Sequence, residues 1–225
     1  MELSAKTEML LSYFAKINQN MLFLEGNTIK TMSEARNVLA SAKIDETIPK
    51  EFGVYDLNEF LRVIALVNPK PNIKFEDDNL LLKDSSGRMK VKYFYSSKES
   101  LTFPDKDVVM PESDVSFTLE DVTFNKIKNA SNAIGHDELT ISGNKNMLTL
   151  SVSDNQNATS NNFSIDVEGS SNSDNFNFVM NIPNMKIIPG DYEVSISSKL
   201  ISNFKHKELD IQYWIALEKS STYEK

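Results

Sequence analysis

The chain has 225 residues, and its 24 lysines and arginines against 32 aspartates and glutamates give it a formal net charge of −8. Its apolar fraction of 40% is enough for a substantial core and too high for a disordered chain, and no apolar run approaches the ~18 residues that a membrane helix needs. The absence of cysteine excludes a disulfide framework, a cysteine nucleophile and cysteine-bound zinc.

The N-terminal segment has the pattern of an amphipathic helix. Leu10, Phe14 and Ile17 recur at helical spacing after Ser4, which is a plausible N-cap, so we predict a helix over about 4–18. Charged residues interrupt the same stretch, which argues against a signal peptide. We therefore expect a soluble protein kept in a cytoplasm.

Short strands follow, and then a second helix. The segment 21–54 has strand patterning, and the turn at Glu25-Gly26-Asn27 predicts a hairpin between its first two strands. Asp56 is an N-cap signal for a second helix, which is predicted to end at Pro69 and Pro71. The predicted buried stripe of this helix is Leu57, Phe60, Leu61, Ile64 and Val67.

Three more strands and a connector complete the first half. The turns at 77–79 and 85–87 separate these strands, which are predicted near 72–76, 80–84 and 88–95. Residues 96–113 contain two prolines and no clear period. They predict an irregular connection between two halves of the chain.

The second half repeats this order of elements. Thr118 and Asp121 form a capping-box-like start to a third helix, which is predicted to run to Ile134 and to end at Gly135. Residues 151–175 include 13 serines and asparagines and predict long polar loops. Strands are predicted near 138–142, 146–152, 162–167, 176–182, 191–197 and 210–218, with at most one helical turn at 184–187.

The order of elements predicts a duplicated architecture. Each half begins with an amphipathic helix and ends in strands, and the helix starts at Ser4 and Thr118 lie 114 residues apart. We predict an α+β fold with two similar domains and large antiparallel sheets. The predicted boundaries are 1–103 for the N-terminal domain, 104–113 for the interdomain connector and 114–225 for the C-terminal domain.

Residue types that usually carry catalysis are scarce. His136 and His206 lie 70 positions apart, and we expect both to be solvated surface residues. Seven glycines occur singly, so no phosphate-binding loop is predicted. Asp77-Asp78 and Glu120-Asp121 have the chemistry of metal ligands, but a hairpin turn and the charge at a helix start explain them better. We therefore predict no catalytic residue, no metal and no cofactor.

The solvent faces of the predicted helices are polar and mildly basic. The second helix presents Arg62 and the first presents Lys16. The third helix presents Asn125, Asn129 and Asn132, flanked by Lys126 and Lys128. Two interpretations remain open. The faces are either ordinary solvated surfaces whose charges compensate the helix dipoles, or a sparse surface for a phosphate backbone.

Several stretches resemble the sliding clamps of T-even-type bacteriophages, which are DNA polymerase processivity factors with the architecture of the PCNA-like clamps. The strongest are VYDLNEFL at 54–61 with LVN at 66–68, and FNFV at 176–179 with NMK at 184–186 and PGDY at 189–192. The resemblance runs from end to end. It implies a DNA-clamp fold and a homotrimeric ring, with antiparallel sheets outside and helices lining a hole that encircles duplex DNA without reading its sequence.

The resemblance also implies which residues meet partners. The candidates for facing DNA are Lys16, Arg62, Lys126, Lys128 and Lys186, with Lys6 nearer the buried stripe. A pocket would hold the C-terminal tail of the phage DNA polymerase, and its candidates are Val108, Val109, Met110, Tyr213, Trp214 and Ile215, of which Trp214 also suits the core. Other implied partners are an ATP-dependent clamp loader and late-transcription factors, in the host bacterial cytoplasm.

Two other functions remain as alternatives. A trimeric β-rich phage structural or assembly protein would explain the polar loops and the acidic composition. A hydrolase built on paired carboxylates would need a deep pocket that holds two acids with shifted pKa values.

Overall fold

The computed structural model describes residues 1–67, 70–143, 147–154, 157 and 159–224, and the chain forms two compact units, Met1–Asp107 and Val108–Lys225. The division falls inside the range predicted as a connector. The predicted helix stop at Pro69, and the first residue of the strand predicted from 146, lie outside the described residues. Among the helices that are described, none is long and apolar enough to cross a membrane.

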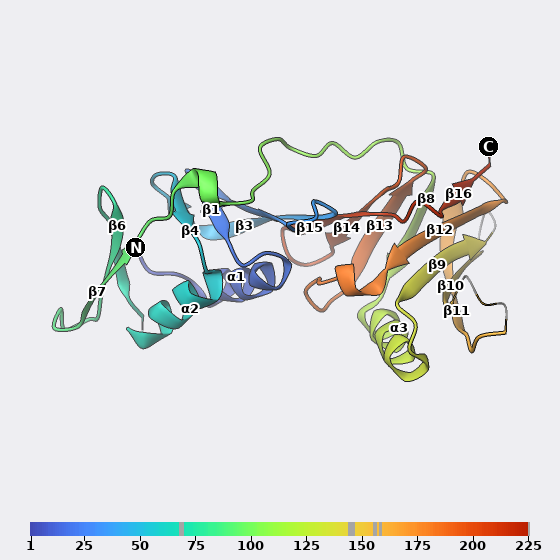
Figure 1. Ribbon diagram of the computed structural model, residues 1–225, viewed down its shortest axis with the longest axis horizontal. Coiled ribbons are helices and arrows are strands. Elements are labelled where there is room, and N and C mark those ends of the chain that lie inside the picture. The colour runs from blue at the N-terminus through green and yellow to red at the C-terminus, as the bar shows by residue number, and fades with distance from the viewer. Residues whose placement is uncertain (68–69, 144–146, 155–156, 158, 225) are drawn as a thin grey trace. The chain divides into compact units, whose positions relative to one another are not determined.

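The first unit combines two capped helices with antiparallel strands in its described part (Figure 1). The hydroxyl of Ser4 accepts a hydrogen bond from the amide of Thr7, and the carboxylate of Asp56 accepts one from the amide of Glu59. Both predicted N-caps are therefore confirmed. The elements are α1 (Ala5–Ile17), β1 (Met21–Phe23), β2 (Gly26–Met32), β3 (Val38–Ile48), β4 (Phe52–Val54), α2 (Leu57–Leu66), β5 (Asn72–Phe75), β6 (Asn79–Lys83) and β7 (Lys90–Phe94), with a 3-10 turn at Lys98–Ser100.

The hairpin predicted between the first two strands is wrong. β1 pairs with β4, while β2 pairs with β3, and β5, β6 and β7 form a third antiparallel group. All three residues of β1 are buried, and the ring of Phe23 stacks on that of Phe52 with the centroids 4.5 Å apart. Burial of this aromatic pair favours β4 as the partner over the strand that is adjacent in sequence.

The core of the first unit lies between the helices and the strands. α1 packs against α2 and β3, and Phe14 and Phe60 are buried in these contacts. Leu61 is only half-buried, so the apolar stripe of α2 is narrower than predicted. Arg62 is exposed on the opposite side of the helix. The amphipathic pattern thus fixes which face of each helix meets solvent.

The second unit is an antiparallel sheet with α3 packed against β10. Its strand order is β16-β12-β9-β10-β11-β8-β13-β14-β15. The elements are β8 (Val115–Leu119), α3 (Asp121–Ile134), β9 (Glu138–Gly143), β10 (Met147–Val152), β11 (Phe163–Ser171), β12 (Phe176–Asn181), β13 (Tyr192–Ser197), β14 (Ile201–His206), β15 (Ile211–Ala216) and β16 (Thr222–Tyr223), with a 3-10 turn at Ile182–Asn184.

The predicted capping box of α3 is wrong, although the helix itself is confirmed. Thr118 lies inside β8, opposite Glu193 of β13, and so cannot cap a helix. The N-cap is Glu120, which makes no side-chain capping hydrogen bond among the described residues. Gly135 ends the helix in the left-handed conformation at φ 74°, as predicted.

Two further expectations for this unit are corrected. β11 continues to Ser171 through the stretch predicted to be polar loop, because its polar side chains occupy exposed positions of the sheet. β14 and β16 were not predicted, and His206, expected at the surface, is only 6% exposed. Lys205 and Lys207 on either side of it are exposed, because side chains alternate along an extended chain.

Candidate nucleic-acid interface

The predicted cations of the first unit lie on the solvent faces of α1 and α2. Lys16 is exposed near the end of α1, and its Nζ lies 3.8 Å from the ring centroid of Tyr13. The side chain of Arg62 is 69% exposed, with a nitrogen 3.9 Å from the carboxylate of Asp56. Neither contact buries the charge. Both side chains therefore keep a cation available to an anionic partner.

Lys6 is the exception among these candidates. Its Nζ lies 2.9 Å from Oδ1 of Asp45 on β3, and this hydrogen bond holds the pKa of the Asp45 carboxyl below its usual range. The side chain thus spans from α1 to the sheet. It is committed to a partner within its own unit.

The predicted cations of the second unit lie on α3 and after the 3-10 turn. Lys126 is exposed, and Nζ of Lys128 lies 4.5 Å above the ring of Phe124. Asn129 and Asn132 are exposed on the same helix, while its buried residues are Thr123, Phe124, Ile127 and Ser131. Lys186 is exposed between the buried Met185 and Ile187.

The start of α3 is bonded to the segment that follows Lys186. The amide of Asp121 donates to Oδ1 of Asp191 at 2.9 Å, and the amide of Gly190 donates to Oδ1 of Asp121 at 3.0 Å. The side chain of Asn125 donates to the other oxygen of Asp121 at 2.9 Å. This reciprocal pair, which we call the Asp121–Asp191 clasp, replaces the predicted local cap.

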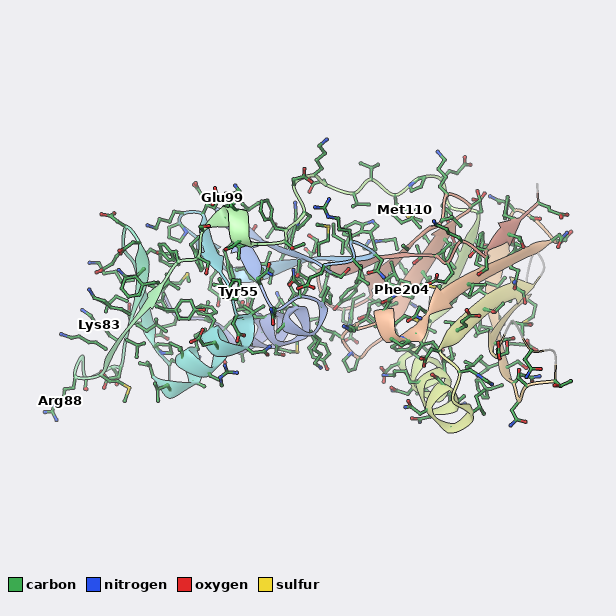
Figure 2. All side chains as sticks on the ribbon, in the orientation of Figure 1. Tyr55, Lys83, Arg88, Glu99, Met110 and Phe204 are labelled. Carbon is green, nitrogen blue, oxygen red and sulfur yellow. The ribbon has the colours of Figure 1, made fainter. Side chains whose placement is uncertain are left out.

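A second group of cations was missed by the sequence analysis. On the three-stranded sheet, Lys83 pairs with Lys90, and Leu81 pairs with Lys74 on one side and Lys92 on the other. Residues paired in this way share one face of the sheet, so the lysines gather there. Figure 2 shows Lys83 and Arg88 pointing outward at the β6–β7 end. The alternating lysines at 90 and 92 can be recognised in the sequence. The face that they share with Lys74 and Lys83 cannot, because it depends on how three strands pair.

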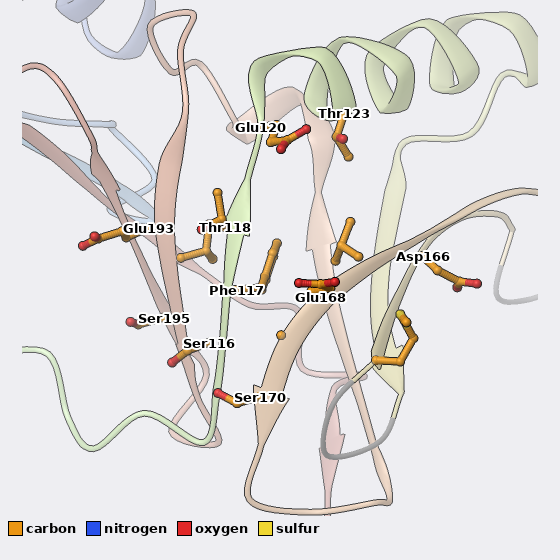
Figure 3. A pocket seen from close by; sticks show the side chains of 14 residues that line it. Ser116, Phe117, Thr118, Glu120, Thr123, Asp166, Glu168, Ser170, Glu193 and Ser195 are labelled. Atoms are coloured by element: carbon orange, nitrogen blue, oxygen red, sulfur yellow. The ribbon is translucent and has the colours of Figure 1, made fainter.

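The second unit has an acidic groove of about 1160 Å³ (Figure 3). It opens beside β11, whose last residues, Gly169–Ser171, pair with β8 while its earlier residues pair with β10. The carboxylates among its lining residues are Glu120, Asp166, Glu168 and Glu193, and each of these residues is exposed. A carboxyl group that acts as a general acid at neutral pH is usually buried, so the groove does not favour the hydrolase alternative.

The candidates for the polymerase-tail pocket lie in two kinds of environment. Val109 in the connector is 84% exposed, with Val108 and Met110 half-buried beside it in sequence. On β15, Tyr213 and Ile215 are fully buried, and the Tyr213 hydroxyl accepts a hydrogen bond from the amide of Ile188. Trp214 lies between them and points to the other face, because strand residues alternate. The three β15 residues therefore do not line one surface.

The comparisons with known proteins cover the whole chain. The family model described as gp45 sliding clamp, C terminal, matches residues 116–219, and the model described as DNA polymerase processivity factor matches residues 4–101. The sliding clamp of Escherichia phage RB69 is 29% identical to the chain over 100% of both sequences. The sliding clamp of Vibrio phage KVP40 is 29% identical over 97% of this chain and 99% of the relative, and that of Enterobacteria phage T4 is 26% identical over 100% of both.

Solved structures agree on the fold. The Proliferating Cellular Nuclear Antigen of Entamoeba histolytica superimposes with a TM-score of 0.70 at 16% identity, over 96% of this chain and 97% of that one. The corresponding protein of Thermococcus kodakaraensis gives a TM-score of 0.68 at 13% identity, over 96% and 99%. The two family models fall one on each unit, and the phage relatives span both. The chain belongs to the phage sliding clamps, the DNA polymerase processivity factors that share the clamp fold.

Proposed function

We propose that this clamp works as a homotrimeric ring that encircles duplex DNA and tethers the phage replicative polymerase, without chemistry of its own. The observation that carries the DNA contact is the isolated placement of exposed cations on helices of a chain whose net charge is −8. A ring that slides needs weak contacts to phosphates and none to bases. Scattered lysines between asparagines fit that requirement better than a dense basic patch.

We further propose that the protomers join through β7 and β11. Within the described residues β7 pairs with β6 alone, and the first part of β11 pairs with β10 alone, so both strands offer an unpaired edge. The exposed residues of β7 include Lys90, Lys92 and Phe94, whereas those of β11 include Asp166 and Glu168. Strand addition between two copies would place these opposite charges on adjacent strands.

The polymerase is proposed to attach by its C-terminal tail at the connector, where Val109 is the most exposed large apolar side chain of the chain's described part. An apolar anchor at such a site gives a partner tail a surface to bury. An ATP-dependent loader would open and close the ring, since the sequence has no phosphate-binding loop of its own. Late-transcription factors are proposed as further partners, and the host bacterial cytoplasm as the site of action.

The DNA contact is tested with two pairs of substitutions that remove the same charge. Lys126→Ala with Lys128→Ala removes two cations from α3, while Lys199→Ala with Lys219→Ala removes two exposed cations from outside the helices. We expect the first pair to shorten polymerase run length on primed circular DNA at physiological salt and the second to leave it unchanged. A variant that also replaces Lys16 and Arg62, remains trimeric and still supports normal run length would refute the proposal.

A further inference from the structure

A buried histidine far from the predicted cations in sequence is bonded to the segment that holds the start of α3. His206 ends β14, and its Nδ1 lies 3.0 Å from the amide of Glu208 and 3.1 Å from the amide of Leu209. Because both amides donate, Nδ1 must carry the lone pair, and the ring proton is on Nε2. Nε2 lies 3.2 Å from the carbonyl oxygen of Pro189 and donates to it.

The ring of His206 also fills the space beside Gly190, the residue that follows Pro189. A Cβ atom added to Gly190 would lie 2.2 Å from Nε2, and the φ of 139° at this position is one that other residues rarely adopt. The ring of Tyr192 packs edge-on against the imidazole at 5.0 Å between centroids. The amide of Lys207 donates to the carbonyl of Asp191 at 2.9 Å. The histidine therefore holds Pro189 and Gly190 by a hydrogen bond and by direct packing.

The same two residues lead directly into the Asp121–Asp191 clasp. Gly190 donates its amide to Asp121, and Asp191 accepts from the first amide of α3. The N-cap Glu120 contributes no capping side chain among the described residues, and the clasp instead gives the first amide of the helix, that of Asp121, its acceptor. Lys186 lies a few residues before the clasp, and Lys126 and Lys128 lie one to two turns after it.

We infer that His206 is a positioning residue for the DNA-contacting surface of the second unit. It fixes the 189–191 segment, and the clasp then fixes the start of α3 relative to Lys186. The three cations of this unit that are proposed to contact DNA thereby keep one arrangement as the ring moves over phosphates. The inference rests on the proposed function, because it assumes that Lys126, Lys128 and Lys186 contact DNA.

Two conservative variants separate the contacts of His206. His206→Gln places an amide NH₂ near the position of Nε2 and keeps a donor for the Pro189 carbonyl. His206→Asn places an acceptor near the position of Nδ1 for the two amides but is too short to reach Pro189. Lys207→Ala, at an exposed neighbour, is the matched control. Thermal unfolding and light scattering would verify that each variant is folded and trimeric.

The readout is the diffusion coefficient of the loaded clamp sliding on stretched DNA, because each phosphate contact that is lost reduces the friction of sliding. We expect His206→Asn to shift this coefficient at least halfway toward that of the Lys126→Ala, Lys128→Ala variant. His206→Gln and Lys207→Ala should slide like the wild type. Equal sliding by His206→Asn and wild type, while the lysine variant slides faster, would overturn the inference and leave the proposed function intact.

A different outcome would concern the proposed function itself. If the lysine variant slides like the wild type, the DNA contact by α3 is absent and the inference falls with it. If His206→Asn does not form a trimer, Asp191→Ala removes the carboxylate that accepts from the first amide of α3, without touching the imidazole, and should produce the same fast sliding. Wild-type sliding by a trimeric Asp191→Ala variant would overturn the inference.

Discussion

The proposed boundary between protomers predicts a charge-reversal experiment. Lys90→Glu with Lys92→Glu would place acidic side chains on β7 next to Asp166 and Glu168 on β11 of the adjoining copy. One exposed ion pair contributes ~0.2–1 kcal/mol, and reversing one charge turns that attraction into a comparable repulsion. For two pairs the change is about 1–4 kcal/mol per boundary, which raises the dissociation constant of each boundary roughly 5- to 700-fold.

The assay is the weight-average mass in solution, measured by light scattering over a wide range of protein concentrations. The chain has a mass of 25.4 kDa, so a trimer would be about three times heavier. We expect the reversed variant to dissociate at concentrations where the wild type is trimeric. The difference should shrink at 1 M salt, where the screening length falls to ~3 Å.

A second pair of substitutions shows whether the two strands meet. Asp166→Lys with Glu168→Lys, combined in one chain with the two β7 substitutions, restores opposite charges across each boundary and should restore assembly. If the β7 variant stays trimeric down to the same protein concentration as the wild type, β7 does not lie at the boundary between protomers. Failure of this combined variant to form a trimer would refute the pairing with β11.

Three other substitutions probe the fold and the partner site. Phe60→Ala should destabilise the first unit by ~3–5 kcal/mol in denaturant unfolding, because the ring is buried between Phe23 and Tyr93. Burial and the nearby carboxylates raise the pKa of Tyr93 to about 12. The unfolded chain therefore loses this proton at lower pH than the folded chain, and the free energy of unfolding should fall as the pH rises from about 10 to about 12. The Tyr93→Phe variant should lose less stability over the same pH range. Val109→Asp should weaken binding of a polymerase-tail peptide in a fluorescence titration, whereas Val122→Asp, at another exposed valine, should not.

Local patterns in the sequence were sufficient where the physical cause is local. Ser4 and Asp56 cap helices because a side-chain oxygen bonds an amide only three residues away, and Gly135 ends α3 because glycine tolerates a positive φ. The apolar period showed which side of each helix is exposed and so located Lys16 and Arg62 on solvent faces. The clamp resemblance, carried by stretches spread along the chain, indicated the family before any packing was known.

Tertiary structure alone decided which segments meet. β1 pairs with β4 because Phe23 finds its stacking partner in Phe52, and no local pattern identifies a partner that distant. His206 is flanked by lysines and has the sequence context of a surface residue, yet the inward face of β14 buries it. Thr118 has the pattern of a capping box, but pairing with β13 extends the strand through it, and the helix start is bonded instead by Asp191 from a distant turn. Such long-range contacts depend on how buried surfaces fit together, which periodicity along the chain does not encode.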